Sequence, residues 1–577
     1  MKKIKLFFIV LFTTIMLIGC SDDFLNTEPL TQKTEPYFYK TQVDAYQALI
    51  GCYSGFLNFD NTSYSWWATC TVSEILSDDG EAGSAIGIGL EADVVDRFDI
   101  GIYPSSLNIY KAHYTAAWVA INRMNKLLSK LDEVDWTTMS GGEGLTTDQC
   151  EGEVKVLRAW TYFCMVRLFG NIPLINETTI DLTKEPQSEP KLIYGQILQD
   201  LKDAATLLSA NAYSRASSTG RMTKWAAEAL AARVYLYYTG YYGNTQQDIP
   251  LGVGKGAVDK NGLTSYVNSI LSEDQIKGYL ADIINSGGFS LVSNYQSLWP
   301  TGSVEAQRHD PNFPGYVGEA NSETVMTQKS TYIPPYGNGG AKWWGPRQVN
   351  TDSVYGTGWG IGIPFAEGWD LFDDNDSRRD ASLMNVMKER GTAGYNLWST
   401  KDQRSFTGFY YKKYMPLNAK PGLAMGTFLG GSDWSDSWYQ DYVLIRYADV
   451  LLMAAEMGID AQANLDKVRV RAYGQEYVSA NPLAPTYENI MNERHLEFFG
   501  EGIRYWDILR QGVEKAAQIL TIPPPGRTVN DGPDIYGSQK IILDGANVLK
   551  TSGLQQIPWD EIDLSNGLYV QNVGWGK

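Results

Sequence analysis

Apolar residues spaced three or four apart predict a series of amphipathic helices along most of the chain. The clearest is 153–169, where Val154, Leu157 and Trp160 fall on one side and Gly170 follows the last turn. The same pattern, in places rich in Ala and Tyr, predicts further helices at 116–131, 194–208, 224–238, 446–458, 465–472 and 486–499. The chain is therefore expected to be mostly α-helical.

The stretch from about 240 to 439 has a different pattern, with few long periodic segments and many Gly, Asn, Pro, Trp and Tyr residues. Loops of this length in a compact protein are usually functional or disordered, and the aromatic content argues against disorder. Helix pairs with Ala, Tyr and Leu at contact positions resemble tetratricopeptide units. We expect a tetratricopeptide-like scaffold of helix pairs, divided into regions 31–240 and 241–577, with a loop-rich, aromatic-rich insertion in the second.

The N-terminus has the pattern of a secretory signal, with a basic start and an apolar run at 6–18 that is too short to span a bilayer. It ends in Leu17-Ile18-Gly19-Cys20, which resembles the bacterial lipobox. This resemblance implies a signal peptide at 1–19, lipid on Cys20 and a linker at 20–30. The following Ser21-Asp22-Asp23 resembles the surface-export signal of Bacteroides-like lipoproteins, although it could also be a flexible acidic linker.

The charge of the chain argues against nucleic acid as a partner, because its formal net charge is −18 and its pI is about 4.8. The cysteines Cys52, Cys70, Cys150 and Cys164 match no metal pattern. A Cys52–Cys70 bridge stays open, and Cys164 lies in an apolar helical stretch as an expected buried thiol. The segment 373–380 lacks the oxygen ligand and glycine that a calcium loop requires. We expect no metal and no cofactor.

Aromatic side chains with a polar edge are abundant, with 17 Trp and 36 Tyr against 3 His. Such rings suit surfaces that are both apolar and wet. A sugar ring fits them, because its C–H bonds stack on the aromatic face while its hydroxyls form hydrogen bonds at the edge.

The C-terminal third carries the most specific pattern. Residues 492–512 read NERHLEFFGEGIRYWDILRQG, which resembles the hallmark segment of the SusD/RagB family. Further matching segments are YVLIRYADVLLMAAE at 442–456, NLDKVRVRA at 464–472, RAWTYF at 158–163, FGNIPL at 169–174, and the ending from Ile557-Pro558 to Gln571-Asn572-Val573-Gly574-Trp575. The resemblance covers nearly the whole mature chain in the right order.

This resemblance implies an outer-membrane lipoprotein that faces the cell exterior and serves nutrient uptake in polysaccharide utilisation. Its implied partners are an oligosaccharide or polysaccharide and a SusC-like TonB-dependent transporter, to which the glycan is delivered without catalysis. Two alternatives remain open. The ligand could be a peptide or another nutrient, or the chain could be a surface glycoside hydrolase.

The hydrolase alternative depends on Glu493 and Glu497, since paired carboxylates cleave glycosides. Opposite charges recur in 493–510 at helical spacing, so these carboxylates lie within reach of arginines. Such carboxylates should stay ionised, whereas a general acid needs a raised pKa. We interpret the segment as scaffold and expect no catalytic residues.

In SusD/RagB proteins the glycan site is a shallow aromatic surface made by loops outside the helical repeats. Two regions of this sequence could supply it. The candidate residues are Trp66, Trp67, Asp78 and Asp79 in one region, and Trp299, Tyr332, Tyr336, Trp343, Trp344 and Trp359 in the other. Glycine and proline around the Trp343-Trp344 pair predict an exposed loop, and a glycine-rich loop is expected to present Trp359. The alternative for each ring is that it packs beneath its own loop.

Overall fold

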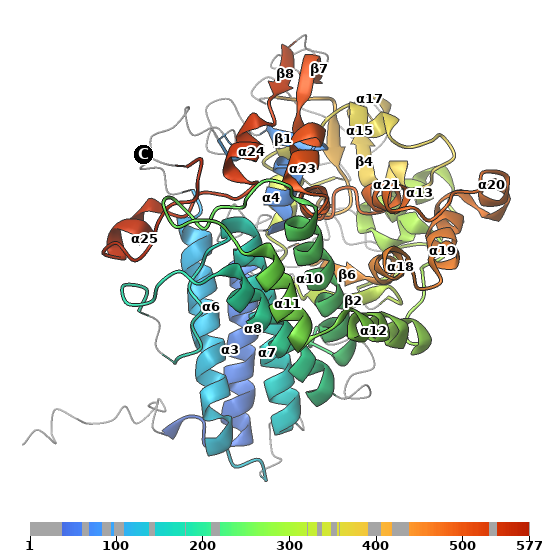
Figure 1. The fold of residues 1–577 in the computed structure, drawn as a ribbon. Helices are drawn as coiled ribbons and strands as arrows, with labels where there is room; N and C mark the ends of the chain where they lie inside the picture. Colours follow the sequence, from blue (N-terminus) through green and yellow to red (C-terminus); the bar gives the residue numbers. More distant parts are fainter. Residues whose placement is uncertain are drawn as a thin grey trace, which may run out of the picture.

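The chain is described by a computed structural model, in which a bundle of long helices packs against a second, more irregular half (Figure 1). The described residues are 37–60, 69–83, 94–96, 98, 109–137, 145–178, 181–208, 220–319, 321–331, 337–347, 355–356, 358–389, 405–417, 438–529 and 539–575. Cys20, with the expected signal peptide and linker, lies outside these residues. So do four of the candidate aromatics, Trp66, Trp67, Tyr332 and Tyr336.

The N-terminal half is built on long helices that lie side by side (Figure 1). They are α3 (Gln42–Asp60), α6 (Lys111–Lys130), α7 (Thr147–Phe169), α8 (Pro190–Leu207) and α10 (Lys224–Asn244). The short η2 (Leu131–Glu133) contacts α6, and the short α4 (Thr69–Ile75) lies between α3 and α6 in the sequence. Helix α7 is central, because it contacts α3, α6, α8 and α10 and is buried along nearly all its length.

The ends of α7 follow from its sequence. The Thr146 side chain accepts a hydrogen bond from the Gln149 backbone N–H at the start. At the other end Gly170 has a φ of 65°, and a Cβ there would lie 2.8 Å from the Leu554 side chain. Glycine is therefore favoured at this helix end for two reasons, the positive φ and the close approach of the Leu554 side chain.

The remaining helices follow in chain order. They are α11 (Lys260–Ile270), α12 (Glu273–Asn285), η3 (Tyr295–Leu298), α13 (Pro300–His309), α14 (Gly340–Trp344), α15 (Glu367–Asp370), α16 (Arg379–Ser382), α17 (Val386–Glu389), α18 (Tyr447–Glu456), α19 (Ala461–Tyr473), α20 (Gln475–Ala480), α21 (Tyr487–Glu497), α22 (Arg504–Leu509), α23 (Val513–Leu520), α24 (Ala546–Thr551) and α25 (Trp559–Leu564). Helices α18, α19 and α21 contact one another and continue the helical scaffold.

The strands described in the structure form small two-stranded antiparallel sheets. The pairs are β1 (Gly80–Gly83) with β3 (Ile361–Pro364), β2 (Thr324–Gln328) with β6 (Tyr442–Arg446), β4 (Leu383–Asn385) with β5 (Phe409–Tyr411), and β7 (Ile522–Val529) with β8 (Gln539–Leu543). Two of these pairs, β1 with β3 and β2 with β6, join segments that are far apart in the sequence, so they hold the insertion against the scaffold.

The prediction of a mostly α-helical, tetratricopeptide-like scaffold is confirmed, and each expected helix is present with bounds shifted by a few residues. The insertion is more helical than its composition indicates, because it contains α11, α12 and α13. A capping box of Ser272 and Gln275 begins α12 and was readable from the sequence. The expected division at 240 falls within the last turns of α10 and stays a prediction.

Cys52, Cys150 and Cys164 are buried, so the burial predicted for Cys164 is confirmed, and the Cys52 thiol forms no bridge. Among the described helices, none combines the length and the apolar character that crossing a membrane requires.

Candidate functional site

The two regions expected to supply the site are brought together by the sheet of β1 and β3. Gly80 pairs with Pro364 and Gly83 with Ile361, although these partners are almost 300 residues apart in sequence. Helix α4, which leads into β1, also contacts β3 and α14. The chain around Asp78 and the chain around Trp359 therefore reach the same part of the molecule.

The glycine-rich segment before β3 is held by backbone contacts. The Gly358 N–H donates to the Pro346 carbonyl at 2.8 Å, and the Gly360 N–H donates to the Gly345 carbonyl at 3.0 Å. A Cβ on Gly358 would lie 2.3 Å from the Gly345 Cα, a distance that real Cβ atoms do not adopt. Glycine is thus required for the close approach that fixes this segment.

Trp359 stands between these pinned glycines and is 36% exposed. The guanidinium of Arg347 lies 5.6 Å from the centre of its ring, and Nη1 of Arg347 donates to the Trp359 carbonyl at 3.3 Å. The prediction of a loop presenting Trp359 is confirmed. Sequence reasoning missed Arg347, and its position directly after Gly345 and Pro346 was the available signal.

Three other candidate tryptophans are buried, so the exposed loop predicted around Trp343 and Trp344 is wrong, and Trp299 is buried as well. Trp299 and Trp344 are each 2% exposed and Trp343 is 6% exposed. The ring of Tyr414 lies 5.4 Å from that of Trp299 and 5.7 Å from that of Trp344, and packs between the two. Because 340–344 forms a helical turn instead of an open loop, both adjacent rings turn into the core.

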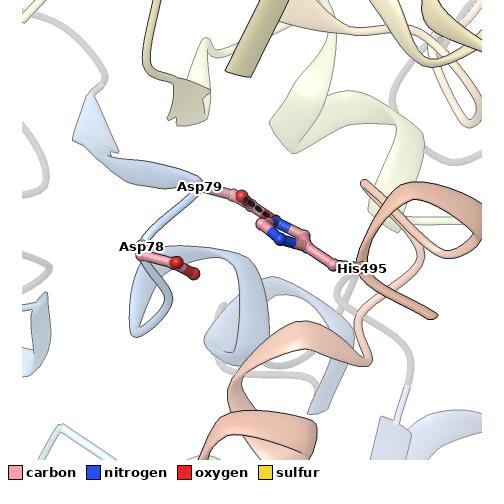
Figure 2. A group of neighbouring side chains, drawn as sticks. All are labelled: Asp78, Asp79 and His495. Carbon is pink, nitrogen blue, oxygen red and sulfur yellow. Dashed lines mark hydrogen bonds and ion pairs between the residues drawn. The ribbon is translucent and has the colours of Figure 1, made fainter. Parts of the chain in front are cut away.

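The acidic turn before β1 is also occupied by protein contacts (Figure 2). Both oxygens of Asp78 accept from Arg504 at 2.7 Å, and Oδ1 of Asp79 lies 2.6 Å from His495 Nε2. Asp79 is buried. These carboxylates tie the start of β1 to the hallmark segment, and their contact with a ligand stays a prediction.

Asp78, Asp79 and His495 could also share a metal ion, since ligand atoms of all three lie within 4.8 Å of one another (Figure 2). However, Arg504 occupies both oxygens of Asp78 and puts a positive charge beside the place of a cation. We assign this group a structural role.

Glu74 completes the junction between α4 and the hallmark segment. Its Oε1 accepts from the Gly502 backbone N–H at 2.6 Å. Burial, and then the nearby Asp79, raises the pKa of Glu74 to about 8. The folded protein therefore holds this carboxyl protonated where the unfolded chain has lost the proton.

We expect this carboxyl to make folding weaken as the pH rises. Between about pH 5 and pH 8 the folded state binds more protons at Glu74 than the unfolded state, so its contribution to stability falls. The variant Glu74→Gln lacks this pH dependence. The unfolding free energy of the variant minus that of wild type should therefore be larger at pH 8 than at pH 5, by on the order of 1–3 kcal/mol. Denaturant unfolding at both pH values, with the exposed Glu488→Gln as control, measures this difference. A difference that does not change with pH contradicts it.

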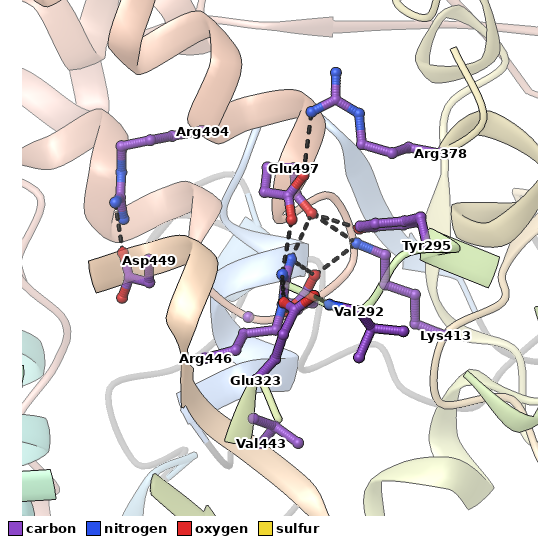
Figure 3. Close-up of polar contacts among 12 residues, drawn as sticks. Val292, Tyr295, Glu323, Arg378, Lys413, Val443, Arg446, Asp449, Arg494 and Glu497 are labelled. Atoms are coloured by element: carbon purple, nitrogen blue, oxygen red, sulfur yellow. Dashed lines mark hydrogen bonds and ion pairs between the residues drawn. The ribbon is translucent and has the colours of Figure 1, made fainter. Parts of the chain in front are cut away.

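The hallmark segment is anchored by a buried network of charges (Figure 3). Arg446, at the end of β6, donates to carboxylate oxygens of Glu501 at 2.7 Å, Glu497 at 2.7 Å and Glu323 at 3.0 Å. Arg471 on α19 donates to Glu323 at 2.7 Å and also to Glu497. These contacts join β2, β6, α19 and α21 at one point.

The turn at 373–380 enters the same network. Arg378 donates to both oxygens of Asp376, at 2.8 and 2.7 Å, and to Glu493 at 2.6 Å. It also donates to Glu497 at 3.2 Å (Figure 3). Its side chain is fully buried. This segment, which lacks the features of a calcium loop, is thus held by buried ion pairs.

Comparison with known proteins gives two family matches. The model described as "Starch-binding associating with outer membrane" matches residues 71–236, and the model described as "SusD family" matches residues 322–575. The chain belongs to the SusD/RagB family.

Full-length SusD relatives agree with these matches. SusD-like protein P2 of Formosa agariphila is 25% identical over 540 residues, which cover 88% of this chain and 91% of that protein. A SusD-like protein of Bacteroides ovatus is 22% identical over 526 residues, which cover 86% of this chain and 80% of that protein.

Solved SusD structures share the fold. A laminarin-binding SusD-like protein has a TM-score of 0.65 at 23% identity, covering 92% of this chain and 99% of that one. Surface glycan-binding protein A from Bacteroides thetaiotaomicron, in complex with laminarihexaose, has a TM-score of 0.65 at 20% identity, covering 92% of this chain and all of that one.

The carboxylates considered for catalysis lie inside the SusD scaffold. Glu497 is fully buried, and although burial raises its pKa, Arg471, Arg446 and Arg378 hold that pKa well below its usual range. For Glu493 burial outweighs Arg378 and raises the pKa, which is the opposite of the direction expected for a carboxylate beside an arginine. Both are closed off from a sugar, so neither is placed to act on one.

Proposed function

We propose that this SusD/RagB protein captures oligosaccharides at the cell surface without catalysis and delivers them to a SusC-like TonB-dependent transporter. The observation that carries the proposal is Trp359, an exposed ring on a backbone fixed by glycine contacts, with the Arg347 guanidinium beside it. A rigid aromatic face binds sugar C–H bonds at little entropic cost. The family matches, and the similar structures of a laminarin-binding protein and of a laminarihexaose complex, support a glycan as the ligand.

The capture mechanism follows from the shape of such a site. Trp359 supplies a stacking face, and Arg347 supplies donors for the hydroxyls at the edge of the sugar ring. Trp66, Trp67, Tyr332 and Tyr336 are proposed as further contacts along the same glycan. One stacked sugar binds weakly, so several contacts along a chain are needed for useful affinity.

Truncating the exposed ring tests this proposal. We expect Trp359→Ala to weaken laminarihexaose binding at least about tenfold, since about 1.4 kcal/mol of stacking and burial is lost. Isothermal titration calorimetry of both proteins measures the effect. Tyr266→Ala, which removes an aromatic ring 42% exposed on α11, should bind as wild type does.

The same proteins distinguish the alternatives. Equal binding by wild type and Trp359→Ala would sink the role of Trp359, and binding of peptides with no retardation on any polysaccharide would sink the glycan proposal. Reducing ends released from a glycan panel by wild type, and lost in Glu493→Gln, would instead favour a hydrolase.

The anchor is the second part of the proposal. SusD-family proteins are in general surface proteins of the outer membrane, and we propose that lipid on Cys20 holds this one on the exterior face beside its transporter. Replacing that cysteine, Cys20→Ala, should leave glycan binding by the purified protein unchanged while growth on the glycan falls to the level of a deletion strain. Undiminished growth contradicts the proposed anchor.

A further inference from the structure

A small cavity lies between the helical bundle and the hallmark segment, away from the surface around Trp359. Its volume is about 40 Å³, and residues of α7, α10, β6, α18, α21 and α22 line it. A cavity needs roughly 10–15 Å³ to hold one water-sized particle, so this one has room for a small ligand. Four arginines and two carboxylates are among the lining residues.

Arg167, on the last turn of α7, is a buried cation in this cavity, with 4% of its surface exposed. Within the described ranges, no carboxylate lies at ion-pair distance from it. The hydrogen bonds it makes there are weak, from Nε to the Phe163 carbonyl at 3.4 Å and from Nη2 to the Cys164 sulfur at 3.6 Å. A buried charge of this kind calls for a counterion.

Aromatic rings surround the guanidinium of Arg167. Its central carbon lies 4.0 Å from the centre of the Phe163 ring and 4.3 Å from that of Trp506. Such contacts favour a cation but leave its N–H groups, which lie in the plane of the guanidinium, able to donate. The cage therefore holds Arg167 in place without neutralising it.

Further donors without an acceptor line the same cavity. Among the residues the structure describes, the Tyr237 hydroxyl, the Trp506 indole N–H and the Arg233 Nε–H have no hydrogen-bond partner. Tyr237 and Trp506 are more than nine-tenths buried. The indole and guanidinium groups can only donate, and the hydroxyl donates as well, so all of them fit a ligand that only accepts.

The two carboxylates in the lining are already neutralised by other groups. Asp507 accepts from Arg494 at 2.8 Å and from Arg510 at 2.7 Å. Glu501 accepts from Lys413 and from Arg446, at 2.7 Å each. Among the described residues that line the cavity, Arg167 is thus the charged group with no ion-pair partner.

From this arrangement we propose that the cavity binds one monovalent anion of halide size, such as chloride, as the counterion of Arg167. The anion accepts from the guanidinium of Arg167 and from the Tyr237 and Trp506 donors. The bound anion links α7 and α10 to α22, and it therefore stabilises the packing of the hallmark segment against the helical bundle.

Bromide in crystals of the wild-type protein tests the site directly. We expect an anomalous difference peak inside the cavity after exchange of chloride for bromide. A cavity filled by water alone, with no anomalous peak, overturns the proposal. This readout needs no variant and is independent of glycan binding.

Thermal unfolding provides a second test. Replacing gluconate by chloride at constant ionic strength should raise the unfolding midpoint of wild type by about 2 °C or more. The rise should shrink in Tyr237→Phe, which removes only the hydroxyl, and vanish in Arg167→Met. It should persist in Arg123→Met, whose arginine is exposed on α6. A rise that is equal in all four proteins contradicts the site.

Discussion

Replacing Glu497 by glutamine is expected to destabilise the fold by about 3–5 kcal/mol, because it removes one partner from a buried group of charges. Its carboxylate accepts from Arg378, Arg446 and Arg471, all of them buried. The amide of the variant adds donors where three guanidiniums already donate. Those cations then stay buried with too few acceptors, and the contacts that join β2, β6 and α19 to α21 weaken together.

Denaturant unfolding of Glu497→Gln beside Glu488→Gln measures this effect. Both changes lie on α21, but Glu488 is exposed and its loss should cost well under 1 kcal/mol. Equal unfolding free energies for the two variants contradict the role of the network. The depressed pKa of Glu497 adds an acid signature, since its contribution is present above the unfolded pKa and is lost as the pH falls through the lower folded pKa.

The scaffold role of 492–512 could be predicted from the sequence, because helical spacing puts its charges on common faces. Its partners could not. Arg446, which ends β6, donates to Glu497 and also to Glu323, which precedes β2, so these contacts depend on a sheet that pairs distant segments. The spacing of charges in the sequence predicts that these side chains form ion pairs. Which distant residue becomes the partner depends on the fold.

The candidate site was also predictable only where local sequence determines the structure. Local glycines indicated that Trp359 is presented by a loop, since the conformation of that loop is set by its own backbone contacts. Local glycines and prolines also indicated exposure for Trp344, but its burial is decided by Tyr414, some 70 residues further along the chain. Exposure of a ring is a tertiary property wherever the covering side chain is distant.

Adding one methyl group beside Trp359, as Gly358→Ala, is expected to reduce laminarihexaose affinity at least about tenfold although every aromatic ring is retained. The new Cβ would lie 2.3 Å from the Gly345 Cα and 2.4 Å from its carbonyl oxygen, so the two backbone segments must separate. That movement breaks the hydrogen bonds made by Gly358 and Gly360 and shifts Trp359 away from Arg347. Calorimetry with Gly278→Ala as control, where a Cβ meets nothing within 4 Å, measures the loss.

Combining the two changes separates a positioning role from general damage. If Gly358 acts only by placing Trp359, the double variant Gly358→Ala/Trp359→Ala should bind no more weakly than Trp359→Ala, because the ring that the glycine positions is already gone. Losses that add in the double variant would mean that Gly358→Ala disturbs other contacts, and the rigid presentation of Trp359 would then no longer explain binding. Non-additive losses would show that the glycine contacts matter to the ligand through this single ring.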